Sequence, residues 1–349
     1  MWAMVMKEFR QVRRDRRTLA LMIVLPLVLL IVFGYAASFD VTEIPTALLG
    51  AEEAEGLVRP PLEVERVDPA GGTAEAEDLL RDGEVAVAVV TGPAGTQALI
   101  DGSQLFSAQA ASEAFARARI PGLDVRVLFN PGMETSAVMV PALAGLILLF
   151  IGTVITSLGV VRERQAGTLE QLAVMPLDPR DVFVGKIAPY FLVAGVDLAV
   201  ILVAGALLFD VPFNGSVATL ALGSLLFLFV TLGMGVLIST VSENQGQAIQ
   251  LAMMTLLPQV LLSGLIFPVS SMAAGVRWIS YLLPLTYFTE ISRGVMLRGA
   301  PLSALAQPML LLAALGVVVF GLALLRFRKF LALAGRPERG EARLERAAA

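Results

Sequence analysis

The chain has 349 residues, of which 56% are hydrophobic and only 16% are charged, and its mean hydropathy is +0.77. That much apolar surface exceeds what one or two soluble cores can bury, so the composition is typical of a membrane protein. Cysteine and histidine are both absent, which excludes disulfides, thiolate nucleophiles, the usual zinc sites and a serine–histidine pair. The net charge of -4 says little, because the charges are unevenly placed.

Six windows meet the requirement of about 20 mostly apolar residues for a membrane-spanning helix. They are Thr18–Phe39, Ser136–Val161, Val182–Phe209, Ser216–Thr240, Ala248–Pro268 and Leu302–Leu325. We therefore predict a membrane all-α fold with six transmembrane helices. Its expected division is residues 1–17, 18–39, 40–135, 136–326 and 327–349.

The N-terminal segment, residues 1–17, is predicted to be an interfacial helix on the cytoplasmic side. Its apolar face holds Trp2, Val5, Met6 and Phe9. Its basic residues are Lys7, Arg10, Arg13, Arg14, Arg16 and Arg17. Basic residues beside the first window place the N-terminus in the cytoplasm. A cleaved signal peptide ending near "YAAS" is the alternative, but the apolar run is long enough to span.

The C-terminal tail, residues 327–349, is expected on the same side. Six crossings return the chain to the cytoplasm, and Arg326, Arg328 and Lys329 directly follow the last window.

Residues 40–135 are rich in acidic residues and turn formers, and they predict a small α+β domain outside the cytoplasmic membrane. The expected strands are Ile44–Leu49, Glu84–Val90, Ala98–Asp101 and Asp124–Phe129, and the expected helices are Ala74–Arg81 and Ser103–Arg119. Asp101, in "DGS", is interpreted as a turn residue rather than a reacting carboxylate.

A compact polar segment, "VRERQAGTLEQLAVMPLDPRDVFVGK", separates two apolar runs at Val161–Lys186. At about 100° per residue, one helical face would hold Val161, Leu169 and Leu172 and the opposite face Glu163, Gly167 and Glu170. We predict an amphipathic helix over 162–175, ended by Pro176 and followed by a helix that Asp178 caps. It could transmit force to a docked partner, or only anchor the loop at the interface.

Polar residues also occur inside the predicted spans. Asp197 lies near the middle of the third span, where a charged carboxylate costs about 2.5–3.5 kcal/mol on insertion scales. It serves either substrate passage or proton binding, or it makes a structural hydrogen bond to a neighbouring helix. The fifth span carries Gln250, Thr255 and Gln259, and such side chains usually face another helix.

The run at residues 268–300 is too broken by prolines and glycines to cross again. We predict two short half-inserted helices at the outer leaflet, packed against the spans. Glu290 and Arg293 lie three residues apart there, and they are candidates for an outer gate or simply for an ion pair with each other.

Several of these segments resemble the membrane-spanning subunit of type-2 ATP-binding cassette (ABC) transporters. They are "RERQAGTLEQL" with "MPLDPRDVFVGK", and "SENQGQAIQLAMMTLLPQVLLSGLIFPVSSMAAGVRWISYLLPLTYFTEISRGVMLRGA" at Ser242–Ala300. "DGSQ" at Asp101–Gln104 and "VLFNPG" at Val127–Gly132 are similar to the drug-exporter-like branch with a large extracytoplasmic domain.

The resemblance implies an export permease that pairs with a second permease, a copy or a homologue, and with two cytoplasmic ATPase subunits. The helix at 162–175 would then be a coupling helix seated on an ATPase, touched by Glu163, Arg164, Gly167, Thr168, Leu169, Glu170 and Leu172. Gln250, Thr255 and Gln259 would line the transport route, and residues 268–300 would form a re-entrant exit gate.

No ATP-binding motif GxxxxGK[ST] occurs, since "VFVGKI" lacks the upstream glycine and the following Ser/Thr. We therefore expect no enzyme activity and no cofactor in this chain, with ATP and Mg²⁺ on the partner ATPases. The other expected partners are membrane lipid and a small-molecule substrate, and nucleic acid is not expected.

Three rival functions differ in class. An ion-coupled secondary transporter would use Asp197, but inverted repeats, which are common in such proteins, are not evident. A membrane-embedded enzyme lacks a nucleophile and base. A sensor whose external domain binds a ligand would share the same architecture.

Overall fold

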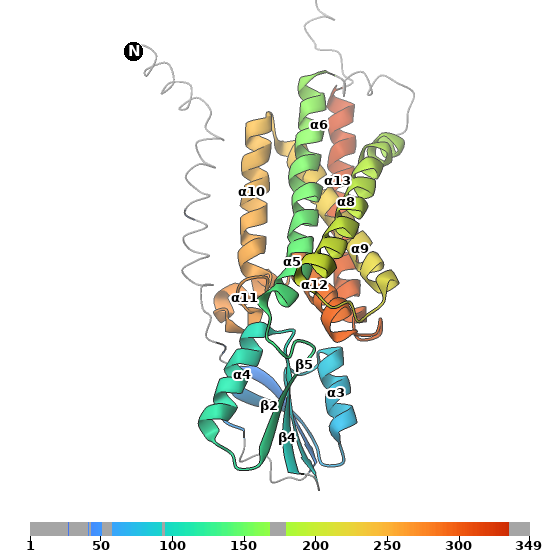
Figure 1. Ribbon diagram of the computed structural model, residues 1–349. Helices are drawn as coiled ribbons and strands as arrows, with labels where there is room; N and C mark the ends of the chain where they lie inside the picture. The colour runs from blue at the N-terminus through green and yellow to red at the C-terminus, as the bar shows by residue number, and fades with distance from the viewer. Residues whose placement is uncertain are drawn as a thin grey trace, which may run out of the picture.

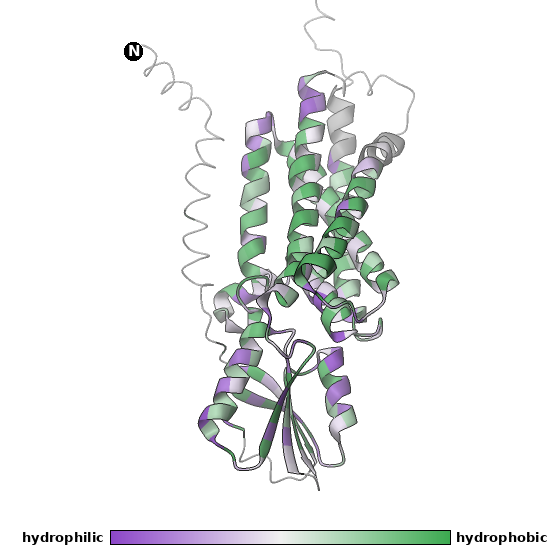
Figure 2. Cartoon of the chain, in the orientation of Figure 1, coloured by the Kyte–Doolittle hydropathy of each residue, from purple (hydrophilic) through white to green (hydrophobic). Residues whose placement is uncertain are grey.

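The computed structural model describes residues 27, 41, 43–50, 58–92, 95–167 and 179–334. Within these ranges the chain forms a helical bundle and, at one end of it, a sheet domain, which comprises the described residues between 41 and 134 (Figure 1). Apolar residues dominate the bundle, whereas polar and apolar residues are mixed in the sheet domain (Figure 2).

The sheet domain contains a five-stranded sheet in the order β2-β1-β3-β4-β5. The strands are β1 (Ile44–Gly50), β2 (Leu62–Asp68), β3 (Val87–Gly92), β4 (Gly95–Asp101) and β5 (Leu123–Leu128). β3 and β4 pair antiparallel, and the other neighbours pair parallel. The domain is therefore closer to an α/β layer structure than to the predicted α+β arrangement.

One helix covers each face of this sheet, α3 (Thr73–Asp82) and α4 (Leu105–Ala118) (Figure 1). Alternation along β3 explains the two cores, because successive side chains point to opposite faces. Val87 and Val89 join the core under α4, and Ala88 and Val90 join the core under α3. The predicted strands and helices are all present with shifted ends.

β2 is the element that the sequence analysis missed. It lies at the edge of the sheet, and along "LEVERVD" only Leu62 is buried. Three of its seven residues are apolar, Leu62, Val64 and Val67. Their alternation breaks after Val64, so the segment lacks the sustained pattern that marks a half-buried strand.

Four described helices are long and apolar enough to cross a membrane: Thr135–Gln165, Ala188–Phe209, Val217–Val241 and Ala306–Arg326. They correspond to the predicted windows at 136–161, 182–209, 216–240 and 302–325. The window at 18–39 and the interfacial helix at 1–17 fall outside the described residues, apart from Leu27. The tail is described only as far as Ala334.

The fifth predicted window corresponds in part to α10 (Gln245–Leu262), which has 18 residues. At 1.5 Å per residue it is about 27 Å long, close to the thickness of a hydrocarbon core. It begins earlier and ends earlier than the window at Ala248–Pro268. In Figure 1 it runs alongside the other long helices.

The first described long helix has three parts, α5 (Thr135–Phe150), the π-helical turn η2 (Ile151–Ile155) and α6 (Thr156–Gln165). The other long helices are α8 (Pro179–Phe209), α9 (Val217–Val241) and α13 (Ala306–Ala334). The outer faces of α8 and α13 expose large apolar side chains, such as Leu207 at 77% and Val317 at 70%, as expected for surfaces that face lipid.

Small residues let η2 and α9 approach closely. A Cβ atom added to Gly235 would lie 2.3 Å from the Gly152 carbonyl oxygen, and one added to Gly152 would lie 2.1 Å from Thr231 Oγ1. Such contacts are typical of membrane helix packing, where association depends on van der Waals fit.

Residues 268–300 form short helices between α10 and α13, and their predicted half-insertion at the outer leaflet stays a prediction. They are η3 (Val269–Ser271), α11 (Ala274–Ser280), α12 (Pro284–Arg293) and the π-helical turn η4 (Gly294–Arg298). They lie at the end of the bundle that meets the sheet domain (Figure 1).

Candidate functional site

We call the end of the bundle at the C-terminus of α6, opposite the sheet domain, the inner end, and the end beside the sheet domain the outer end, as names for position only (Figure 1). α6 ends at Gln165: the N–H of Ala166 donates to the Arg162 carbonyl at 3.0 Å, and the N–H of Gly167 donates to the Arg164 carbonyl at 3.1 Å. Gly167 has φ +73°, a left-handed conformation that glycine adopts without steric cost.

The start predicted for the coupling helix, Arg162, is therefore wrong, because Arg162–Gln165 belong to the long helix and the chain turns at Gly167. Of the seven predicted coupling residues, Glu163 and Arg164 lie on the last turn of α6, and Gly167 lies at the turn that follows it. The remaining four, Thr168, Leu169, Glu170 and Leu172, and the predicted cap Asp178, lie outside the described residues.

Two long-range hydrogen bonds fix the end of α6 to the turn between α9 and α10. Arg164 Nη1 donates to the Ser242 carbonyl at 2.9 Å, and Gln245 Nε2 donates to Gln165 Oε1 at 2.9 Å. The turn is itself ordered, since Asn244 caps α10 by accepting from the N–H of Gln247 at 2.9 Å. The inner ends of α6, α9 and α10 are thus one connected unit.

Asp197 is half-buried on α8 and shares a helical face with the buried residues Ala194 and Leu198. This face packs against the bundle, so Asp197 points toward protein rather than toward the exposed apolar side. Whether it serves transport or packing stays a prediction.

The polar residues of α10 occupy different environments. Gln259 is fully buried, and its Oε1 accepts from the N–H of Leu285 in the first turn of α12 at 3.4 Å. Thr255 Oγ1 donates to the carbonyl of Leu251 in its own helix at 2.9 Å. Gln250 Oε1 is buried and has no hydrogen-bond partner within the described ranges. Gln259 therefore joins two helices, which is the packing role.

Arg293 holds the outer ends of three helices together. Its Nε and Nη1 donate to the carbonyls of Val138 and Gly264 at 3.3 Å, and its Nη2 donates to the carbonyl of Leu265 at 3.4 Å. The last two carbonyls follow the C-terminus of α10, where a cation is favourable. No ion pair forms between these two described residues, Glu290 and Arg293, because the guanidinium points to the three carbonyls.

A buried ion pair joins the sheet domain to the bundle, and the sequence analysis missed it. Arg298 Nη1, on η4, lies 3.5 Å from Asp101 Oδ2, with side-chain exposures of 6% and 0%. Asp101 Oδ1 accepts from the N–H of Ser103 at 2.8 Å, so its predicted turn role is present as well. The signal for a second role was the arginine inside the apolar run "GVMLRGA".

Other contacts reinforce this junction. An apolar cluster, the junction cluster, contains Leu105, Ala137, Val138 and Leu297. Arg277 Nη1 lies 3.6 Å from Glu43 Oε2. Burial, followed by Glu84 and Asp78, raises the pKa of Asp82 at the end of α3, while Arg81 and Arg298 lower it.

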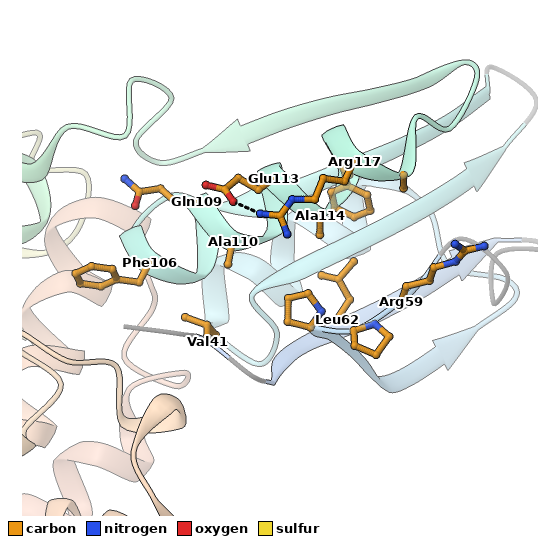
Figure 3. Close-up of a pocket in the computed structure, with 13 residues that line it drawn as sticks. Val41, Arg59, Leu62, Phe106, Gln109, Ala110, Glu113, Ala114 and Arg117 are labelled. Carbon is orange, nitrogen blue, oxygen red and sulfur yellow. Dashed lines mark hydrogen bonds and ion pairs between the residues drawn. The ribbon is translucent and has the colours of Figure 1, made fainter. Parts of the chain in front are cut away.

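The sheet domain also carries a groove of about 660 Å³ between α4 and the β1–β2 side of the sheet (Figure 3). Ala110, Ala114 and Leu62 line its apolar part, and an exposed ion pair between Arg117 and Glu113, at 2.6 Å, lies beside it. No group of three or more metal-ligating side chains occurs among the residues that the structure describes. Arg59, Gln109, Glu113 and Arg117 also line the groove, which therefore offers a surface of mixed apolar and charged character.

Four long apolar helices, an ordered polar turn at one end and an α/β domain at the other define a multi-pass membrane protein. Residues 16–325 match the family model described as "ABC-2 family transporter protein". The chain therefore belongs to this family and is a permease of the type-2 ABC class.

The chain is similar to three Escherichia coli K12 proteins. "Probable multidrug ABC transporter permease YbhS" is 29% identical over 368 residues, which cover 94% of this chain and 96% of that protein. "Probable multidrug ABC transporter permease YbhR" is 28% identical over 334 residues, which cover 86% and 91%. "Inner membrane transport permease YhhJ" is 34% identical over 217 residues, which cover 59% and 56%.

Proposed function

We propose that this chain is the permease subunit of an ATP-driven exporter that moves apolar or amphipathic molecules across the cytoplasmic membrane. The names of YbhS and YbhR, which include the word multidrug, support such a substrate class. The energy would come from separate ATPase subunits that bind ATP and Mg²⁺. A second permease, identical or homologous, would complete the complex.

The observation that carries this proposal is the connection between α6 and the α9–α10 turn. A partner that pushes on residues 162–175 would move the inner ends of three helices together, because Arg164 and Gln165 are hydrogen-bonded to Ser242 and Gln245. The helix that begins with α5 starts beside the sheet domain and ends at Gln165, so the same movement would reach the outer end. Such a rigid linkage can shift the population between inward-open and outward-open states.

The proposed topology follows from the same arrangement. The end of α6 and the C-terminal end of α13 lie on the side away from the sheet domain (Figure 1). With the basic residues of the two termini on the cytoplasmic side, the sheet domain would lie outside the cytoplasm.

The direct test is efflux of a fluorescent apolar cation from cells that express the chain with its cognate ATPase. Export is expected with the intact ATPase and should stop when the ATPase carries a substitution in its catalytic glutamate. Efflux that continues with the inactive ATPase and follows an ion gradient would instead support an ion-coupled transporter that uses Asp197. Purified chain without the ATPase should hydrolyse no ATP.

A second test concerns the coupling residues. Gly167→Trp and Glu170→Arg should reduce ATPase co-purification and export, whereas Thr73→Trp, on an exposed position of α3, should change neither. Unchanged co-purification and export in both inner-loop variants would refute the coupling assignment.

A further inference from the structure

A cavity of about 290 Å³ lies where the sheet domain meets the outer ends of the helices. We call it the interface cavity. Its walls come from the start of α4 (Leu105), the start of α5 (Val138), the end of α10 (Ser263), α12 (Thr289) and η4 (Arg298). Its volume is close to the lower end of the range for ligand-binding pockets in proteins.

Four buried polar atoms in its lining have no hydrogen-bond partner within the described part of the chain. They are Ser103 Oγ, Ser263 Oγ, Thr289 Oγ1 and Arg298 Nε. Each of these residues is at most 7% exposed. Buried polar groups are nearly always paired, because an unpaired one loses its hydrogen bonds to water without compensation. Four such atoms around one cavity, on three different elements and one strand–helix turn, indicate a polar ligand.

The groups favour a ligand that accepts hydrogen bonds. Arg298 Nε can only donate, and the three hydroxyls can donate. α4 begins at this cavity, and its N-terminal end favours negative charge. The Asp101 carboxylate already accepts from the N–H of Ser103 and contacts Arg298 Nη1, so a ligand would use Arg298 Nε and the hydroxyls. Glu290 is the acidic side chain of the lining. Burial raises the pKa of its carboxyl, while Arg298 lowers it, so burial weakens the opposition of Glu290 to an anionic ligand.

The rest of the lining is apolar. Leu105, Val138 and Leu265 are buried, and Met139, Pro268 and Val269 complete the apolar wall. From this pairing of donors with an apolar wall, we propose that the interface cavity binds a small amphipathic carboxylate. The carboxylate accepts hydrogen bonds from Arg298 Nε, Thr289 and the other hydroxyls, and the apolar body contacts Val138 and Leu265.

The test uses the absence of cysteine from the chain. Gln104→Cys places a single thiol on the cavity lining, and Thr73→Cys places one on an exposed position at the first turn of α3. The full chain is reconstituted in lipid nanodiscs without an ATPase, and labelling by N-ethylmaleimide is timed with phenylbutyrate, phenylbutanol or phenylbutylamine added. Because no ATPase is present, the outcome is separate from that of the transport assay.

Phenylbutyrate should slow the labelling of the Gln104→Cys variant in a saturable way. Phenylbutanol should protect this thiol less, and phenylbutylamine should protect it least. Labelling of the Thr73→Cys variant should not change with any of the three compounds. Thr289→Val, combined with Gln104→Cys, should weaken the binding of phenylbutyrate by about tenfold or more, the loss expected for one hydrogen bond to a charged group. Its unfolding temperature should not fall, since the hydroxyl that it removes has no partner within the described residues. Three results would overturn the proposal. They are equal protection by all three compounds, protection by none of them, and full protection by phenylbutyrate in both the Thr289→Val and the Ser263→Ala variants.

Discussion

The ion pair between Asp101 and Arg298 allows a sharp test of how the sheet domain is held. Asp101→Asn removes the negative charge but keeps an oxygen that can accept from the N–H of Ser103. It leaves the Arg298 guanidinium buried without its carboxylate. Breaking a buried ion pair by removing one partner costs about 3–5 kcal/mol.

The lower end of this range applies here. The contact is a single one at 3.5 Å, longer than a charge-assisted hydrogen bond, and Arg298 Nε already has no partner within the described residues. A loss of about 3 kcal/mol would lower the unfolding temperature by roughly 6 °C, at about 2 °C per kcal/mol for a chain of this size. The fluorescence of Trp278, on α11 beside this junction, follows unfolding during heating.

The double variant Asp101→Asn/Arg298→Met is the control. Replacing both charged partners with uncharged groups of similar size is often nearly neutral, so the double variant should recover most of the lost unfolding temperature. Two results would refute the reasoning: Asp101→Asn unfolding at the wild-type temperature, or the double variant losing the sum of the two single losses.

Three further substitutions test the inner end and the helix packing. Gly167→Val should impair export, because its left-handed backbone costs a β-branched residue about 1–2 kcal/mol, whereas Gly167→Asn should be tolerated; equal efflux from both variants would contradict this. Gly235→Ala should lower the yield of folded protein in gel filtration, because its Cβ would meet the Gly152 carbonyl at 2.3 Å, while Gly195→Ala, with open space around it, should behave as wild type. Gln259→Leu should lower the free energy of unfolding by about 1–3 kcal/mol, because it leaves the Leu285 N–H unpaired. Gln259→Glu keeps the acceptor and is the control. Equal unfolding temperatures for the two variants would argue against this hydrogen bond.

The sequence predicts best where one physical signal dominates. The long apolar helices could be found because lipid requires about 20 apolar residues in a row, and β3 could be found because both of its faces are buried. β2 was missed because the apolar alternation of this short edge strand breaks after Val64. The turn at Gly167 was missed because helical periodicity ignores the left-handed conformation that ends α6.

The candidate site was predicted less completely. Arg164 and Gln165 were in the right segment, but their partners Ser242 and Gln245 lie in another turn, and no local pattern predicts such a pairing. Arg293 was predicted as a gate residue or as the ion-pair partner of Glu290, but its partners are backbone carbonyls, which sequence patterns do not identify. The pairing of Asp101 with Arg298 depends on how the sheet domain docks, and that is a property of the tertiary structure.

The π-helical turn η2 gives the long helix between Thr135 and Gln165 an offset of about one residue, or roughly 100° of rotation, relative to an uninterrupted α-helix. The half before this turn packs mainly on α12 and α8, and the half after it packs on α9 and α10. Loss of that one extra residue would swing Arg164 away from Ser242 while leaving the outer half in place. The π-helical turn thus sets the rotation of the inner half of the helix relative to the outer half. A helix of the same composition without this turn could make the contacts of one half but not those of both.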